Sequence, residues 1–335
     1  ADGQVLESPR APALNVDVTG SGTAATAQTA MLPSPSTSRA AESSARLSTG
    51  CGLASLSSQA FAMWDETGSI REVERQSGES RVLTWQRSEP GQWRLSGLSA
   101  HPTFTKTGWL YIVEMAATGN PALRLSRYRQ VGDVLGERAV LLQTPLDTKP
   151  ARTFAAFGPD GYLYVALLSS ASTPLPSTGA TRSRFLIRVS ETGVSAPGDQ
   201  AGTVFAAATA ENPVAVAFAP DSAVPWVLTR LSDDGYLVTR LGDEPAVQDR
   251  LNSGSAPVSM QVTQSGAQQF LYITGTRGDV RQLSRGAVGW TLRDGFRLFN
   301  GSEALGDALV LDGGEIAACG RFDGSSYGVW RGRLP

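Results

Sequence analysis

The side chains best suited to chemistry are few in this sequence. The chain of 335 residues contains one histidine, His101, and two cysteines, Cys51 and Cys319. A zinc site built from cysteine and histidine needs three or four such residues close together. A serine–histidine–aspartate triad would have only His101 as its base. The composition therefore excludes most sites that depend on these residue types, and we predict no metal site.

The two cysteines lie near opposite ends of the strand-rich part of the sequence, at positions 51 and 319. We predict that Cys51 and Cys319 form a disulfide that joins the two ends of a closed fold; the alternative is a pair of buried free thiols. A disulfide is typical of an oxidising compartment. The sequence begins Ala-Asp-Gly, without Met or a hydrophobic leader, as after signal-peptide cleavage. We therefore expect a secreted or periplasmic protein.

The bulk composition favours an all-β fold. Hydrophobic residues make up 41% of the chain, with 36 glycines and 19 prolines, which indicates many turns and few long helices. Charged residues make up 18% and the net charge is −2, so no basic surface is expected to attract nucleic acid. No stretch approaches the roughly 20 apolar residues of a membrane-spanning helix, so no transmembrane segment is expected.

Residues 1–49 differ from the rest of the chain. They are rich in Ala, Ser, Thr and Pro and contain no aromatic residue, so they cannot bury enough apolar surface to fold alone. One short segment, residues 14–18 (LNVDV), alternates apolar and polar residues as an edge strand does. We predict an extended N-terminal arm at 1–49 that docks on a surface, with other protein subunits as its expected partners, and one folded domain at 50–335.

Strand and turn patterns recur through residues 50–335. Four segments combine an apolar strand, a turn containing Pro, Asp or Gly, and a second strand: residues 98–114, 154–167, 214–228 and 308–318. Two further strand clusters cover residues 61–74 and 258–283. A period of roughly 40–60 residues with several strands per unit is typical of a β-propeller. We predict an all-β fold, a six-bladed β-propeller with an extended N-terminal arm.

Several segments are similar to the glucose/sorbosone dehydrogenase family, the soluble sugar dehydrogenases that use pyrroloquinoline quinone (PQQ). Residues 91–104 (GQWRLSGLSAHPTF) resemble the family's Gly-Gln-Gly-Gly-Leu-Leu-Gly-Leu-Ala-x-His-Pro-x-Phe signature. Further resemblances occur in family order at 124–129 (RLSRYR), 157–165 (FGPDGYLYV), 212–218 (NPVAVAF) and 256–260 (APVSM). The resemblance implies a six-bladed propeller that holds PQQ and sugar at its axis, with calcium beside the cofactor, and a structural role for His101 as a turn cap.

The residues that this chemistry requires are mostly replaced. The family's general base is a histidine before the Gly-Pro-Asp-Gly turn, and Pro150 stands at that spacing. The family's Gly-Asp-x-Gly after the turn is replaced by 166–169 (ALLS). The arginine before Asn-Pro is Glu211, and the family's Arg-x-Arg-Asp becomes Ala304-Leu305-Gly306-Asp307. The resemblance therefore implies that three arginines able to pair with cofactor carboxylates are missing.

Four residues remain at positions that face cofactor or sugar in the family, namely Gln92, Asn212, Arg277 and Asp307. We expect these to be vestigial cofactor-binding positions, with no catalytic residue and no bound cofactor. Two functions stay open. The first is a secreted, non-catalytic propeller that acts as a binding or structural module in an assembly, with sugar as a possible ligand. The second is a working PQQ- and calcium-dependent aldose dehydrogenase that oxidises a sugar by hydride transfer to the quinone.

Overall fold

The computed structural model describes most of the chain after residue 50. The described residues are 51–86, 89, 91–147, 149–169, 185–196, 212–231, 235–241, 245–251, 255–286, 289–298, 304–311, 314–321 and 327–333. The predicted arm at 1–49 lies outside them, as does Glu211.

Strands dominate the described part, and one short helix, α1 (Phe104–Thr107), follows the fifth strand. The first eight strands are β1 (Cys51–Ser55), β2 (Ala60–Asp65), β3 (Ile70–Glu74), β4 (Ser80–Trp85), β5 (Trp93–Ala100), β6 (Trp109–Ala116), β7 (Ala122–Val131) and β8 (Val134–Pro145). The next seven are β9 (Arg152–Phe157), β10 (Leu163–Leu168), β11 (Leu186–Val189), β12 (Pro213–Ala217), β13 (Trp226–Arg230), β14 (Gly235–Arg240) and β15 (Pro245–Arg250). The last seven are β16 (Pro257–Ser265), β17 (Gln268–Gly275), β18 (Asp279–Gly286), β19 (Gly289–Arg297), β20 (Ala304–Leu311), β21 (Glu315–Arg321) and β22 (Tyr327–Arg333).

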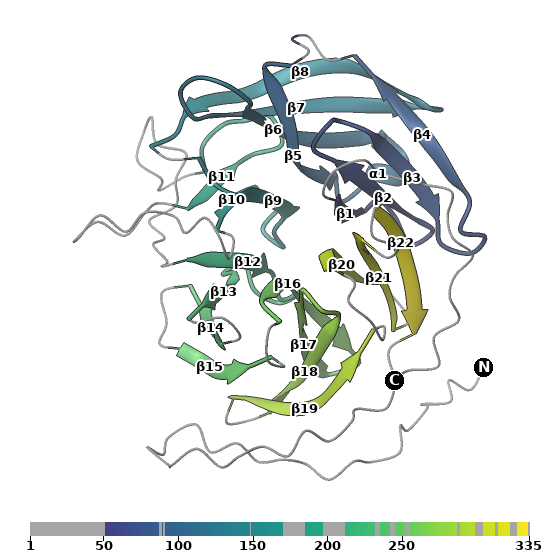
Figure 1. The fold of residues 1–335 in the computed structure, drawn as a ribbon. Coiled ribbons are helices and arrows are strands. Elements are labelled where there is room, and N and C mark those ends of the chain that lie inside the picture. Colours follow the sequence, from purple (N-terminus) through teal and green to yellow (C-terminus); the bar gives the residue numbers. More distant parts are fainter. Residues whose placement is uncertain are drawn as a thin grey trace.

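The described strands form five sheets arranged in a ring (Figure 1). Four sheets are antiparallel: β9–β11, β12–β15, β16–β19 and β20–β22. The fifth has eight strands and consists of two antiparallel units, β1–β4 and β5–β8, joined by a parallel pairing of Thr84 with Val134 and Trp85 with Leu135. The prediction of an all-β propeller is confirmed. The predicted number of six blades is confirmed only in part, because the first two units, β1–β4 and β5–β8, form one continuous sheet.

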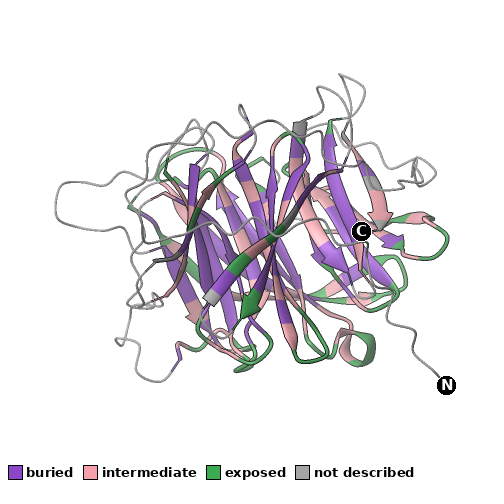
Figure 2. Cartoon of the chain, turned by 90° about the horizontal axis from the view of Figure 1, so that it is seen from below, coloured by how far each residue is buried: buried purple, intermediate pink, exposed green. Residues whose placement is uncertain are grey.

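Burial explains why these segments form sheets that stack around an axis. In Figure 2 buried residues run along most strands, and every residue of β10 (LYVALL) is buried. Strands with two buried faces need a neighbouring sheet on each side. Buried clusters supply those contacts: Tyr111, Leu125 and Val165 from three strands belong to one of them. Apolar side chains of the strands therefore pack mainly between neighbouring sheets.

The Gly-Pro-Asp-Gly turn forms between β9 and β10 as predicted. The Gly161 N–H donates to the Gly158 carbonyl at 3.0 Å, and Gly161 adopts a φ of 78° that favours glycine. The Asp160 carboxylate accepts the Tyr162 N–H at 3.2 Å and the Tyr164 hydroxyl at 2.7 Å. The turn thus fixes the direction in which β10 leaves β9.

The predicted disulfide is present and closes the ring. Cys51 at the start of β1 bonds to Cys319 in β21, and their Cα atoms lie 6.1 Å apart. The alternative of two free thiols is wrong, since both cysteines are bonded. In the chain-entropy model, a loop of this length stabilises the folded state by about 5.6 kcal/mol. Glu315 adds a charged link at the same seam, because it contacts Arg75 from the first sheet at 3.4 Å.

Removal of the disulfide is expected to lower thermal stability. The Cys51→Ser/Cys319→Ser double variant should lose about 2–5 kcal/mol of unfolding free energy, seen in calorimetry as a melting temperature lower by several degrees. Intact-mass analysis of the native parent should show no alkylation until reductant is added. Two cysteines that alkylate in the native, unreduced protein would contradict the closure.

Tyr164 is expected to weaken the fold at alkaline pH. Burial and the hydrogen bond to Asp160 raise the pKa of Tyr164 to about 12. An unfolded tyrosine ionises near pH 10, so between about pH 10 and 12 the unfolded state binds fewer protons and stability falls as pH rises. Urea unfolding at pH 9 and pH 11 should show a smaller pH-dependent loss for Tyr164→Phe than for the parent. An equal loss in both proteins would contradict this assignment.

Candidate functional site

The innermost strands of the ring enclose an axial cavity of about 580 Å³. β1, β5, β9, β12, β16 and β20 all contribute to its wall, and Figure 1 shows these strands around the centre of the ring. Apolar side chains form part of the wall, among them Phe154, Ala155 and Met260. Arg152 and Asp307 line one end, and His101 and Phe218 line the other. The cavity therefore has a charged end and an end of mixed aromatic and polar character.

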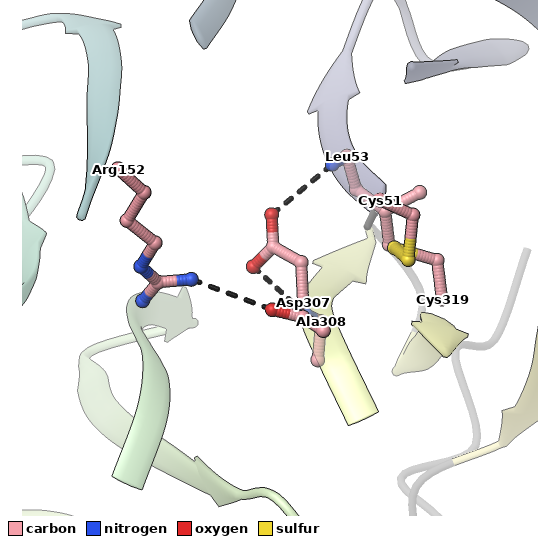
Figure 3. Close-up of a disulfide and its surroundings, with 7 residues drawn as sticks. Cys51, Leu53, Arg152, Asp307, Ala308 and Cys319 are labelled. Atoms are coloured by element: carbon pink, nitrogen blue, oxygen red, sulfur yellow. Dashed lines mark hydrogen bonds between the residues drawn. A yellow bond between two sulfur atoms is a disulfide. The ribbon is translucent and has the colours of Figure 1, made fainter. Parts of the chain in front are cut away.

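Arg152, the first residue of β9, crosses the charged end of the cavity (Figure 3). Its guanidinium donates to the carbonyl of Val214 in β12 at 2.6 Å and to that of Gly306 in β20 at 3.4 Å. It also donates to the carbonyl of Val258 in β16. Burial lowers the pKa of the Arg152 guanidinium, and the nearby Asp307 carboxylate opposes that shift. Arginine stays protonated in proteins, so a positive charge is held at the axis.

Asp307 lies opposite Arg152 and extends the same network to the first sheet (Figure 3). Its carboxylate accepts the Leu53 N–H at 3.1 Å and the Ala308 N–H at 2.9 Å. Burial raises the pKa of Asp307, while Arg152 and the two N–H donors act in the opposite direction. A register shift between Leu305 and Asp307 sets Asp307 beside Cys319 of β21. The carboxylate thus sits directly beside the disulfide seam.

Two further side-chain contacts continue the network around the ring. The Thr153 hydroxyl donates to the Ser96 hydroxyl at 3.1 Å, which joins β9 to β5. The Gln261 amide donates to the Val310 carbonyl at 2.8 Å and accepts the Val310 N–H, which joins β16 to β20. Together with Arg152 and Asp307, these contacts connect the innermost strands of all the units. We call the set Arg152, Thr153, Asp307 and Gln261 the axial tie.

The four residues predicted to face a cofactor differ in their position relative to the cavity. Gln92 is exposed in the turn before β5, and Arg277 is exposed in the turn between β17 and β18. Asn212 precedes β12 with a positive φ of 46°, and its carbonyl accepts the Arg230 N–H at 3.2 Å. Of the four, Asp307 alone lines the cavity. The role of Gln92, Asn212 and Arg277 as cofactor positions stays a prediction.

The positions where the resemblance implied lost residues are tightly built. Pro150 is buried beside the start of β9, and residues 166–168 are buried within β10. A Cβ at Gly306 would lie 3.1 Å from the Cys51 sulfur and 3.2 Å from the Cys51 carbonyl oxygen. Any side chain at position 306 would therefore make a tight contact with the disulfide seam.

Arg152 is the important residue that sequence reasoning missed. The one available signal was a charged residue directly before the apolar run of β9 (RTFAAF). Its three acceptors are backbone carbonyls, which every residue carries, so no side-chain pattern announces them.

His101 caps a turn, as predicted. Its Nδ1 accepts the Thr103 N–H at 3.1 Å, and its carbonyl accepts the Phe104 N–H at 2.8 Å. The backbone donor at Nδ1 assigns the ring proton to Nε2, which contacts the Glu191 carboxylate at 3.0 Å. His101 is thereby held by local and cross-sheet contacts at the mouth of the cavity.

Comparison with solved structures identifies the fold. No protein-family model and no curated protein matches the sequence. The PQQ-bound aldose sugar dehydrogenase from Streptomyces coelicolor matches with a TM-score of 0.66 at 17% identity, over 88% of this chain and 96% of that one. The aldose sugar dehydrogenase from Escherichia coli, in its apo form, matches with a TM-score of 0.64 at 15% identity, over 85% and 96%.

A putative glucose dehydrogenase from Thermus thermophilus also matches, with a TM-score of 0.63 at 19% identity, over 85% and 96% of the two chains. The chain therefore has the propeller fold of the PQQ-dependent sugar dehydrogenases, as the sequence resemblance implied. Within the described ranges, no helix is long and apolar enough to cross a membrane. The same part of the chain contains no cluster of three or more His, Cys, Asp or Glu residues that would suit a metal ion.

Breaking the axial tie is expected to destabilise the fold. Arg152→Met removes the cation nearest to the Asp307 carboxylate and three bonds to backbone carbonyls. Both side chains are partly buried, so the loss should exceed the roughly 1 kcal/mol of an exposed pair and stay below the roughly 3–5 kcal/mol of a fully buried one. Arg152→Met/Asp307→Asn should lose less than the sum of the single changes, with a coupling of about 0.5–3 kcal/mol in urea unfolding.

Arg81→Met provides a matched control for that cycle. Arg81 is half exposed and pairs with Glu72 and Asp133 at the surface. Its loss should cost at most about 1 kcal/mol. If Arg152→Met were no more damaging than Arg81→Met, the tie would not stabilise the ring.

Proposed function

We propose that the protein is a non-catalytic relative of the sugar-dehydrogenase propellers, which acts as a binding or structural module. The observation that carries the proposal is the engagement of Arg152 by three backbone carbonyls at the charged end of the axial cavity. A side chain held in this way contributes to the ring itself and has few donors left for a ligand. In this proposal the units β1–β4 and β5–β8 count as two blades of a six-bladed ring.

The residues of the cavity do not fit PQQ, a planar group with three carboxylates. Among the described residues that line the cavity, Arg152 is the sole lysine or arginine, and Asp307 lies beside it. Recognition of several carboxylates calls for several charge-assisted pairs. Gly306, at the position of one family arginine, carries no side chain, and a Cβ there would lie 3.1 Å from the Cys51 sulfur. Pro150, at the position of the family's histidine, has no group that could accept a proton.

The cavity nevertheless suits a small, largely neutral molecule. Its volume of about 580 Å³ lies within the usual range of small-molecule sites, roughly 300–1,000 Å³. Phe157 and Phe218 supply aromatic surface at the end away from Arg152, where Ser57 and His101 add polar atoms. Aromatic faces beside hydrogen-bonding groups are compatible with the sugar ligand that the sequence suggests. The disulfide supports the further proposal that the protein works in the periplasm or outside the cell.

A working PQQ-dependent aldose dehydrogenase is the second candidate. It is supported by the shared fold and by the retained Gln92, Asn212 and Asp307. In this alternative these residues, with Arg277, would help to hold PQQ and calcium at the axis, and the quinone would supply the acceptor for the hydride of the sugar. The two candidates differ in one measurable property, the binding of PQQ.

A reconstitution experiment separates the candidates. Calorimetric titration of the protein with PQQ in the presence of calcium should give no tight binding, since each missing charge-assisted pair removes about 1.5–3 kcal/mol. Dye reduction with a panel of aldoses should stay at the level of a protein-free blank. The Streptomyces coelicolor enzyme serves as the positive control for the assay. A nanomolar dissociation constant, or sugar-dependent dye reduction, would establish the dehydrogenase and overturn the non-catalytic proposal.

A further inference from the structure

The sheet that closes the ring is short by one strand within the described part of the chain. β20, β21 and β22 form an antiparallel sheet in which β22 pairs with β21 alone. By contrast, the units β1–β4, β5–β8, β12–β15 and β16–β19 each contain four described strands. No described strand pairs with the outer side of β22, so its outward backbone donors and acceptors can pair with a segment outside the described residues.

We propose that residues 14–18 supply the fourth strand of this last sheet by pairing with the outer edge of β22. The partner is thus a segment of the same chain, and the proposal is independent of any ligand or cofactor.

The disulfide places Cys51, the first residue that the structure describes, beside this sheet. Cys51 is bonded to Cys319 in β21, and β21 is the neighbour of β22. The chain that precedes Cys51 therefore enters the fold at the last sheet. A fourth strand would lie one strand spacing, about 4.8 Å, beyond β22. Residues 19–50 join this strand to Cys51, and a chain of that length spans far more than two strand spacings.

The sequence of the segment fits an outer strand. Leu14, Val16 and Val18 share one face and Asn15 and Asp17 share the other, as in a strand with one buried and one solvated face. On β22, Val329 is buried against the first sheet in a cluster with Phe61 and Met63. The apolar face of the added strand would continue this buried face outward.

The sheet β9–β11 also has three described strands, with β11 at its edge. It is the weaker choice for residues 14–18. Residues 190–211 follow β11 directly in the chain and are therefore the nearer candidates in sequence for that edge, whereas the disulfide tethers Cys51 to β21. The closing sheet is therefore the one we assign.

Hydrogen exchange at residue resolution over Tyr327–Arg333 tests the pairing in the full-length protein. Alternate amides of β22 face away from β21, and in the parent these should exchange slowly. Val16→Pro removes a backbone donor from the proposed strand and should speed exchange at those amides by about tenfold or more. Ala25→Pro, in the same arm but outside residues 14–18, is the matched control and should leave exchange unchanged. Amides of β10 report whether the propeller stays folded in every variant.

A synthetic peptide of residues 10–22, added to the Val16→Pro protein, should restore slow exchange at the same amides. Rapid exchange of the outward amides in the parent would overturn the proposal, because the edge would then be free. Protection that increases with protein concentration, together with a doubled mass in light scattering, would also overturn it, since the segment would then pair with a second copy. Neither result depends on PQQ binding, so failure here is distinguishable from failure of the non-catalytic proposal.

Discussion

The guanidinium of Arg152 is the point on which the ring depends. A propeller is held together mainly by apolar contacts between neighbouring sheets. Such contacts have no preferred direction, so they do not by themselves fix how the innermost strands meet at the axis. Arg152 adds directional bonds from β9 to carbonyls of β12, β16 and β20, which lie 62, 106 and 154 residues further along the chain. Arg152 is partly buried, so its guanidinium loses part of its hydration, and the three carbonyls replace some of the lost hydrogen bonds. These bonds therefore favour the arrangement in which the three strands bring their carbonyls to the axis.

Asp307 and the disulfide make the closure seam part of the same arrangement. Asp307 receives the Leu53 N–H of β1 and balances the charge of Arg152, while its register neighbour Cys319 is bonded to Cys51. The covalent link restricts the unfolded chain, and the hydrogen bonds select the folded geometry. Gly306 allows both, because its missing side chain leaves room for the Cys51 sulfur and its carbonyl accepts from Arg152. Gly306 and Asp307 of β20 thus take part both in the contacts beside the disulfide and in the hydrogen bonds at the axis.

Much of the fold could be predicted from the sequence because its signals are local. The turn at Gly158–Gly161 needs only its own proline, aspartate and glycine, and the capping role of His101 needs only Thr103 and Phe104. The disulfide could be predicted because the chain has just two cysteines. The axial tie could not be predicted, because the acceptors of Arg152 are backbone carbonyls that the fold brings together from three distant strands. The eight-stranded sheet escaped prediction for the same reason: the pairing of Thr84 with Val134 is between outer edges and leaves no pattern in either strand.

The axial tie also bears on the relation between fold and chemistry. A cavity that binds a charged cofactor must keep its charged groups available, which leaves them costly to bury in the empty protein. Here the charged end of the cavity is satisfied by the chain itself, through three carbonyls for Arg152 and two N–H groups for Asp307. A group that is bonded to the ring has fewer donors or acceptors left for a ligand. In the proposed non-catalytic role, the capacity of the cavity for binding therefore lies with its apolar wall and its mouth around His101.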